Sequence, residues 1–182
     1  MKVAVFLTYN YSLQTWLNSG TLNRELEIYN QISNISSAEF TFYTYGDSDD
    51  LELIKDFPKF KVVPMFKKIT TKSKVYKFVY SLFLPIILRK NIKNEDILHQ
   101  HQLLGSWVVL ISKLLYSKKL LIRTGYDMFE FSKLNNEGLI RRFLLRCLTY
   151  VSLKFSDLYT TTSREDIKFL NTNFKPNHKK IK

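Results

Sequence analysis

The chain has 182 residues, of which 45% are hydrophobic and 15% aromatic, and its formal net charge is +12 at pH 7. The length predicts one domain, and the apolar content excludes a disordered chain and supports a sizeable core. A single cysteine, Cys147, excludes a disulfide framework and a cysteine-based zinc site, and it fits a reducing cytosol. The apolar run after Met1 and Lys2 is too short for the core of a signal peptide, so we do not expect secretion by that route.

The first half of the chain alternates predicted strands with a helical segment. Residues 2–8 form a continuous β-branched run that predicts a buried parallel strand, and a polar loop over residues 9–20 follows. Apolar residues at helical spacing predict an amphipathic helix over residues 21–35. Residues 39–45 and 60–63 are the second and third predicted strands.

The second half continues this alternation through to a polar tail. In chain order we predict a helical segment over 75–88, a strand over 96–101, a helix over 103–116, a strand over 119–124, a helix over 139–155, a strand over 157–161 and a short helix over 164–170 capped by Ser163. We expect one domain over residues 1–171, followed by a loose basic tail or the start of an interdomain linker over residues 172–182.

Strands that alternate with helices predict an α/β domain with a Rossmann-like, doubly wound parallel sheet covered on both faces. Ligands of such sheets bind at the carboxyl ends of the strands. The loops over residues 9–20, 46–50, 99–105, 123–127 and 161–164 are therefore expected to form the site.

The positive charge is concentrated after residue 60. Residues 1–60 hold four basic and eight acidic side chains, whereas residues 61–182 hold 24 basic and eight acidic ones. Between Lys61 and Lys93 there are nine lysines or arginines and no carboxylate. Such a block repels itself unless a polyanion is nearby, so nucleic acid, an anionic membrane surface and phosphate-bearing ligands are candidate partners.

An apolar segment over residues 75–88 lies inside this basic block. It is shorter than the stretch of about 20 residues that spans a bilayer, and Lys77 and Pro85 interrupt it. It is a buried helix with lysine side chains that reach solvent, or an interfacial element whose apolar residues enter the headgroup layer, or both on different faces. In the second interpretation, anionic lipid binds to the surrounding basic residues, which are Lys67, Lys68, Lys72, Lys74, Arg89, Lys90 and Lys93.

Two histidines lie on the fourth predicted strand. Strand alternation places His99 and His101 on the same face. No cysteine or carboxylate accompanies them locally, so the pair is a weak metal site and we predict no metal. At the carboxyl end of a parallel strand, His101 can instead hydrogen-bond a sugar hydroxyl or a phosphate. The alternative is an ordinary core histidine.

Other candidate residues lie in the loops after the strands. Arg123 can bind a phosphate with two hydrogen bonds and Gly125 permits a tight exit from the sheet, although Arg123 can equally neutralise Asp127. Gly20, after Ser19, either lets backbone N–H groups approach a phosphate or is an ordinary loop glycine.

Three further residues are expected to have no functional role. Arg24 and Glu25 lie one turn into the first predicted helix and are assigned to its solvated face. Cys147 falls in the apolar stripe of the helix over residues 139–155, so we expect an inert core thiol.

In this order, the motifs resemble the N-terminal half of a family-4-like glycosyltransferase of the GT-B fold. The resemblance covers most of residues 1–171. It rests on the opening strand KVAVFLT, the Ser19-Gly20 loop before a helix with Arg24-Glu25, and the segments DILHQHQLLGSW, KLLIRTGYD and SDLYTTTSREDIKFL. Similar enzymes act on lipopolysaccharide, capsule or glycolipid precursors and transfer a sugar from a nucleotide-sugar with retention of configuration. They often rest on the cytoplasmic surface of the membrane.

This resemblance implies roles for particular residues. The loop at Ser19 and Gly20 would lie under the donor diphosphate, although many relatives carry two glycines there. His101 would approach the donor sugar near the reaction centre as the catalytic residue, and Arg123, Gly125 and Tyr126 would line the acceptor side. The nucleotide-sugar is a co-substrate, and no cofactor is implied.

The resemblance also implies a missing half. Similar enzymes hold the nucleotide-sugar mainly with a second Rossmann-like domain, which carries a basic residue for the diphosphate and a paired-glutamate motif. The 182 residues end before such a domain could begin, so we expect a fragment, a half-enzyme whose partner is a separate chain, or a remnant. On its own it is expected to bind the acceptor or a membrane and to turn over slowly or not at all.

Three other functions are possible. The charge and the aromatic residues would suit a nucleic-acid-binding module, but the sequence has no helix-turn-helix pattern, RNA-recognition signature or zinc knuckle, so nucleic acid is not an expected partner. The second possible function is that of a non-catalytic Rossmann-like interaction subunit. The third, a dehydrogenase, is disfavoured because the glycine-rich dinucleotide fingerprint is absent; a Walker-type phosphate loop is absent too.

Overall fold

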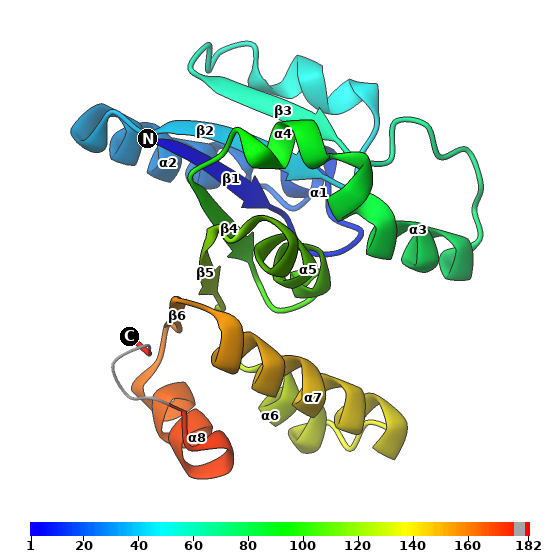
Figure 1. Ribbon diagram of the computed structural model, residues 1–182, viewed down its shortest axis with the longest axis vertical. Helices are drawn as coiled ribbons and strands as arrows, with labels where there is room; N and C mark the ends of the chain where they lie inside the picture. Colours follow the sequence, from blue (N-terminus) through cyan, green and yellow to red (C-terminus); the bar gives the residue numbers. More distant parts are fainter. Residues whose placement is uncertain (177–180) are drawn as a thin grey trace.

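Six parallel strands form one sheet at the centre of the molecule (Figure 1). The computed structural model describes residues 1–176 and 181–182. The strands are β1 (Lys2–Phe6), β2 (Glu39–Thr44), β3 (Phe60–Pro64), β4 (Ile97–His101), β5 (Lys119–Arg123) and β6 (Leu158–Thr160). Their order across the sheet is β3-β2-β1-β4-β5-β6, and every neighbouring pair is parallel. The chain starts in the middle and builds outward in both directions, so the predicted doubly wound, Rossmann-like class is confirmed.

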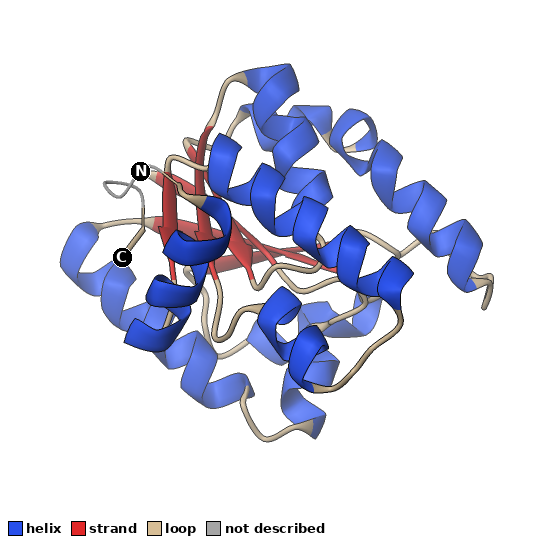
Figure 2. Cartoon of the chain, turned by 90° about the horizontal axis from the view of Figure 1, so that it is seen from below, coloured by secondary structure: helices blue, strands red, loops and turns tan. Residues whose placement is uncertain are grey.

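Helices cover both faces of this sheet (Figure 2). They are α1 (Leu13–Asn18), α2 (Leu22–Ser36), α3 (Lys74–Ile87), α4 (Arg89–Lys93), α5 (Ser106–Tyr116), α6 (Met128–Leu134), α7 (Leu139–Phe155) and α8 (Arg164–Phe174), with a 3-10 helix η1 (Ser48–Ile54). Ser163 caps α8 as predicted, because its hydroxyl accepts from the N–H of Asp166 at 2.9 Å. Four of these elements, α1, η1, α4 and α6, are not among the predicted ones.

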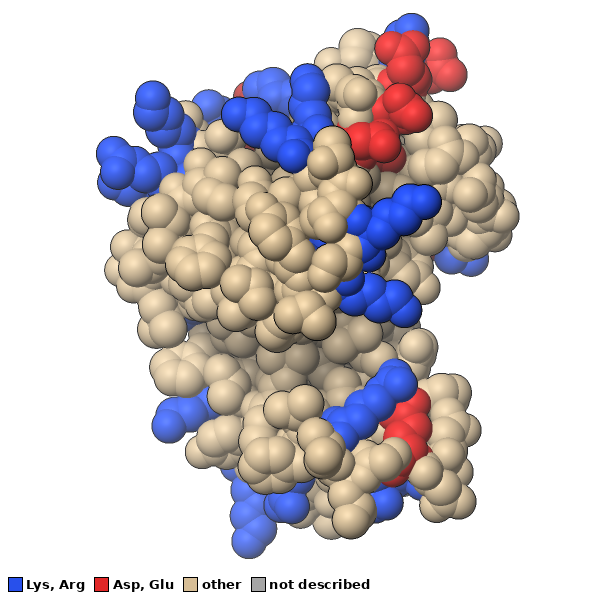
Figure 3. Space-filling model, turned by 90° about the vertical axis from the view of Figure 1, so that its right-hand side faces the viewer, with Lys and Arg blue, Asp and Glu red and all other residues tan. Residues whose placement is uncertain are grey.

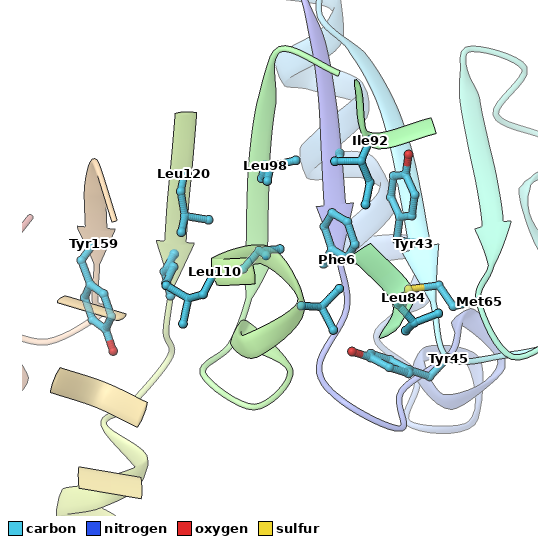
Figure 4. Close-up of a cluster of buried hydrophobic side chains, with 14 of the residues drawn as sticks. Phe6, Tyr43, Tyr45, Met65, Leu84, Ile92, Leu98, Leu110, Leu120 and Tyr159 are labelled. Atoms are coloured by element: carbon cyan, nitrogen blue, oxygen red, sulfur yellow. The ribbon is translucent and has the colours of Figure 1, made fainter. Parts of the chain in front are cut away.

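The side chains of β1 alternate between two cores, as a buried parallel strand requires. Val3 and Val5 face α1 and α2, where they pack with Phe42. Phe6 faces the opposite side, which α3, α4, α5 and α7 cover, and it stacks on Tyr43 with 4.4 Å between ring centroids (Figure 4). The two cores hold the strand ends in a fixed register, and this register positions the site described below.

The described residues near the end of the chain are more ordered than predicted. Helix α8 continues to Phe174, beyond the predicted end at residue 170. Ile181 is buried and forms a parallel bridge with Tyr159. The expectation of a loose tail is therefore wrong for these described residues, because Phe174 and Ile181 both pack on the core. That an interdomain linker begins here stays a prediction.

Helix α3 is the apolar segment inside the basic block, and it is buried along one side only. Ser81, Leu84 and Pro85 are its buried residues. The large apolar side chains that remain exposed are Val75, Tyr76, Phe78, Val79, Phe83, Ile86 and Ile87. The interpretation as a buried helix is therefore wrong for most of its surface. No helix in the described part of the chain is long and apolar enough to cross a bilayer.

The side of helix α7 that faces the core matches the predicted apolar stripe only in part. Its buried residues are Leu145, Thr149, Ser152 and Leu153. Cys147 points to solvent, so the prediction of an inert core thiol is wrong. The helix carries two apolar stripes, and the buried one is richer in small polar side chains than the exposed one. Of the apolar residues that hydrophobic spacing indicated, Leu148 and Val151 pack against the core, whereas Ile140, Phe143, Leu144 and Cys147 are exposed.

Candidate functional site

Three side chains from separate elements meet at the carboxyl edge of the sheet. His101 is the last residue of β4, and its register partner Arg123 is the last residue of β5. The carboxylate of Glu25, from α2, lies with Oε2 3.3 Å from His101 Nε2 and 3.5 Å from an Arg123 guanidinium nitrogen. The same nitrogen of Arg123 lies 3.4 Å from His101 Nε2. The predicted meeting of His101 and Arg123 is therefore correct, and Glu25 is the residue that joins them.

Glu25 is ionised although only 6% of its surface is exposed. The hydrogen bond from His101 lowers the pKa of this carboxyl to about 2, with help from Arg24 and Arg123 and against the opposing effect of burial. A carboxylate only accepts hydrogen bonds, so His101 donates to it through Nε2. The prediction that Glu25 lies on a solvated face is wrong: burial of its charge is compensated by three cationic or hydrogen-bonding neighbours.

The remaining surroundings of His101 are aromatic and buried. The indole ring of Trp16 meets the imidazole edge-on, with 5.3 Å between ring centroids. His101 Nδ1 is buried and has no hydrogen-bond partner among the described residues. His99 lies two residues earlier on the same face of β4, as predicted, with Nδ1 3.5 Å from the Tyr29 hydroxyl. Burial lowers the pKa of His99 to about 3, so this imidazole is neutral and belongs to the core.

The loop at Ser19 and Gly20 reaches this cluster through Trp16. The carbonyl of Trp16 accepts hydrogen bonds from the Ser19 hydroxyl at 3.0 Å and from the Thr21 N–H at 2.9 Å. Gly20 adopts a φ of +70°, which favours glycine, and its own N–H donates to Leu17 at 2.9 Å. The N–H groups of the loop are thus used within the loop. Thr21 makes no side-chain cap, which leaves the first N–H groups of α2 without a side-chain acceptor.

The residues after β5 do not form the ion pair between Arg123 and Asp127 that the sequence also allowed. Arg123 does not neutralise Asp127, because it pairs with Glu25. Asp127 instead caps α6, accepting from the N–H of Glu130 at 2.8 Å, and burial raises the pKa of its carboxyl to about 6. The N–H of Gly125 donates to the side chain of Gln102 at 3.0 Å, and Tyr126 is half exposed beside α6. Gly125 and Tyr126 thus lie in the loop that follows Arg123, between β5 and α6.

Other predicted residues lie outside this cluster. Lys67, Lys68, Lys72 and Lys74 are exposed in the segment that runs from β3 into the first turn of α3. Within residues 1–176 and 181–182, no group of three or more histidine, cysteine or acidic side chains is placed to hold a metal ion.

The cluster presents two accessible cations, Arg24 and Arg123, beside a buried acid. The Arg123 side chain is 37% exposed, whereas those of His101 and Glu25 are 10% and 8% exposed. The guanidinium therefore has donors left for a phosphate or for sugar hydroxyls, while Glu25 holds both neighbours in place. The first N–H groups of α2, which Thr21 does not cap with its side chain, add a second position that favours negative charge.

Comparison with known proteins gives structural neighbours only. No protein-family profile and no curated protein matches the sequence. Sucrose-phosphate synthase from Thermosynechococcus elongatus superposes with a TM-score of 0.60 at 12% identity, over 93% of this chain and 81% of that one. A glycosyltransferase from Rickettsia africae has a TM-score of 0.57 at 14% identity, over 100% of this chain and 41% of that one. The lipopolysaccharide outer core galactosyltransferase WaaB, in its apo form, gives the same score and identity, over 100% and 44%.

These likenesses show the fold. The chain has the Rossmann-like fold of one half of a GT-B glycosyltransferase, so the resemblance expected from the sequence is confirmed at the level of the fold. It spans less than half of the length of the Rickettsia enzyme and of WaaB.

Proposed function

We propose that this chain is the N-terminal, acceptor-binding half of a retaining glycosyltransferase, which moves a hexose from a nucleotide-sugar to a polysaccharide or lipid-linked acceptor. The observation that carries the proposal is the meeting of Glu25, His101 and Arg123 at the carboxyl edge of the sheet. Ligands of doubly wound sheets bind at this edge. The glycosyltransferases among the structural neighbours support this class of reaction.

The proposed roles follow from the positions of the side chains. His101 hydrogen-bonds the donor sugar near the reaction centre, and Glu25 fixes the orientation of its ring. Arg123, with Gly125 and Tyr126, lines the acceptor side of the site. The Ser19-Gly20 loop and the first turn of α2 face the donor diphosphate, where the N–H groups of the helix favour negative charge. No cofactor is invoked, because the nucleotide-sugar is a co-substrate.

A donor-binding half completes the proposed enzyme, either as a further domain or as a separate subunit. The leaving diphosphate develops charge during transfer, and stabilisation of that charge is commonly the largest contribution to catalysis. We therefore propose weak or no turnover by residues 1–182 alone. The exposed apolar residues of α3, with Lys67, Lys68, Lys72 and Lys74 beside them, support a peripheral position on the cytoplasmic face of an anionic membrane.

The direct test is sugar transfer. Radiolabelled nucleotide-sugars are incubated with host membranes, the chain and the polypeptide that supplies the donor-binding half, and label is counted in lipid and polymer fractions. We expect incorporation that requires both polypeptides. Absence of transfer by a stable complex of the two would favour a non-catalytic interaction subunit. Steeply salt-dependent binding to duplex DNA, without binding to anionic vesicles, would favour a nucleic-acid-binding module.

A further inference from the structure

Helix α7 exposes a continuous apolar stripe on the side that faces away from the core. Residues 140, 143, 147 and 150 recur at helical spacing, opposite the buried residues of the same helix. We call this set the outer stripe; it consists of Ile140, Phe143, Cys147 and Tyr150. The exposed fractions are 79% for Ile140, 65% for Phe143 and 49% for Tyr150, and Leu139 and Leu144 flank the stripe with similar exposure. A surface helix normally carries polar residues on this side.

A cationic groove borders the outer stripe. It has a volume of about 330 Å³ between α7 and α8, where Arg146 and Tyr150 face Phe174. An adjoining groove of about 270 Å³ adds Arg142 and Lys133. No carboxylate lines either groove, and among the described residues neither Arg142 nor Arg146 has an ion-pair partner within 4.0 Å. Unpaired cations next to exposed apolar side chains suit an anionic amphiphile.

We propose that the outer stripe and its arginines form a second membrane contact, which docks onto a bilayer of anionic phospholipid. The apolar side chains enter the boundary between headgroups and acyl chains, while Arg142, Arg146 and Lys133 bind lipid phosphates. This contact is separate from the one proposed for the lysines before α3. It goes beyond sugar transfer, because it requires no donor or acceptor.

The arrangement of the helices supports a bilayer as the occupant. The first turns of α3 and α7 point to the same side of the molecule (Figure 1). Figure 3 views that side, which shows two largely uncharged projections with a hollow between them; lysines and arginines surround them, and acidic side chains lie along one edge. The first turns of both helices can therefore approach the same surface.

Charge disfavours a second copy of the chain as the occupant. A two-fold contact through the outer stripe would bring the arginines of one copy close to those of the other. The groove linings hold no acidic residue that would neutralise them. A layer of lipid phosphates supplies that negative charge.

Cys147 permits a direct test, because it is the single cysteine and lies on the outer stripe. An environment-sensitive maleimide dye is attached to Cys147, and vesicles of phosphatidylcholine, with or without phosphatidylglycerol, are added. We expect a blue shift of the emission with the anionic vesicles, and quenching by lipids with brominated acyl chains. The matched control carries Cys147→Ser and Leu114→Cys, which places the dye at an exposed apolar position of α5, and its emission should not change.

Variants separate the apolar and the charged contributions. Phe143→Ser with Leu144→Ser removes exposed apolar surface, and Arg142→Glu with Arg146→Glu reverses the charge; each pair should weaken vesicle binding at least tenfold. Leu114→Ser with Leu115→Ser, and Lys59→Glu with Lys119→Glu, are the controls, and they should bind like the wild type.

Two results would overturn the proposal. The first is an unchanged emission from the dye at Cys147 while the chain floats with anionic vesicles. The second is a lipid-free dimer that Phe143→Ser dissociates, which would make the stripe a contact between copies. A failure of sugar transfer would leave both measurements interpretable, so the two proposals fail separately.

Discussion

The carboxylate of Glu25 accepts a hydrogen bond from His101 across 76 positions of sequence, with 3.3 Å between Oε2 and Nε2. This pair connects the first long helix to the end of β4 and holds Arg123 beside it. The geometry of the candidate site therefore depends on one buried charge.

Replacement of Glu25 by Gln tests how much the ionised carboxylate contributes to the free energy of unfolding. The folded pKa of about 2 lies below the unfolded value, so the stabilisation is present above about pH 5 and is lost as the pH falls to about 2. A shift from 4.5 to about 2 corresponds to at most about 3 kcal/mol. We expect Glu25→Gln to lower the free energy of urea unfolding at pH 7 by 1–3 kcal/mol, to order of magnitude, and to lose the acid dependence between pH 5 and 3.

The exposed neighbour Glu27 supplies the control on the same helix. Glu27→Gln should leave both the stability at pH 7 and its acid dependence unchanged. Equal acid profiles for the wild type and Glu25→Gln would show that the carboxylate is not held as described.

The buried carboxyl of Asp127 should make the stability of the fold depend on pH in the opposite direction. Burial raises the pKa of this carboxyl from 3.8 to about 6, so the folded state binds more protons between these values and its stability falls as the pH rises. Asn also caps helices well. We expect Asp127→Asn to raise the melting temperature at pH 8 by several degrees and to leave it nearly unchanged at pH 4. The exposed Glu165→Gln is the control; a variant that melts lower at pH 8 would contradict the expectation.

Gly46 is required by the packing around η1. A Cβ at this position would lie 2.8 Å from the Cβ of Ser12 and even closer to the carboxylate of Asp50. Asp50 is buried and accepts hydrogen bonds from the Thr44 hydroxyl and the Gln14 N–H, so it cannot move freely. We expect Gly46→Ala to cost about 1–3 kcal/mol in urea unfolding. Gly138→Ala, where a Cβ meets no atom within 4 Å, should cost less than about 1 kcal/mol, and equal losses would exclude the steric cause.

The basic segment before α3 gives a prediction for membranes. Each lysine near an anionic surface contributes about 1 kcal/mol, so reversing four of them should weaken vesicle binding at least about 100-fold. The variant changes Lys67, Lys68, Lys72 and Lys74 to Glu, and the charge-matched control changes Lys55, Lys59, Lys119 and Lys168. Binding of the first variant to anionic vesicles in low salt with the same affinity as the charge-matched control would contradict the electrostatic contribution of these lysines.

Most of the fold was predictable from the sequence because its strands are continuous apolar runs. All six predicted strands are present, with ends that differ by one or two residues. Helix α1 was missed because its six residues bury only Leu13 and Trp16, too few to produce a helical period. Its capping box at Ser12 and Thr15 was the available signal, but it uses Thr in place of the usual Glu or Gln.

The site was predictable only in part. His101 and Arg123 end neighbouring strands, and strand order then places them together. Glu25 gave no local signal, because a charged residue on an amphipathic helix is normally solvated. Its burial depends on partners 76 and 98 positions away. In α7, two apolar stripes have similar spacing, and only the packing on α5 and α6 decides which is buried.

The most direct test of the proposed site is the turnover of His101→Ala in the enzyme that contains both halves. We expect transfer to fall at least about 100-fold, because a contact at the reaction centre is lost. The His101→Ala chain should still unfold cooperatively in urea, so the loss cannot be attributed to a missing fold. Unchanged turnover in a folded His101→Ala variant would remove His101 from the site and with it the acceptor-half assignment.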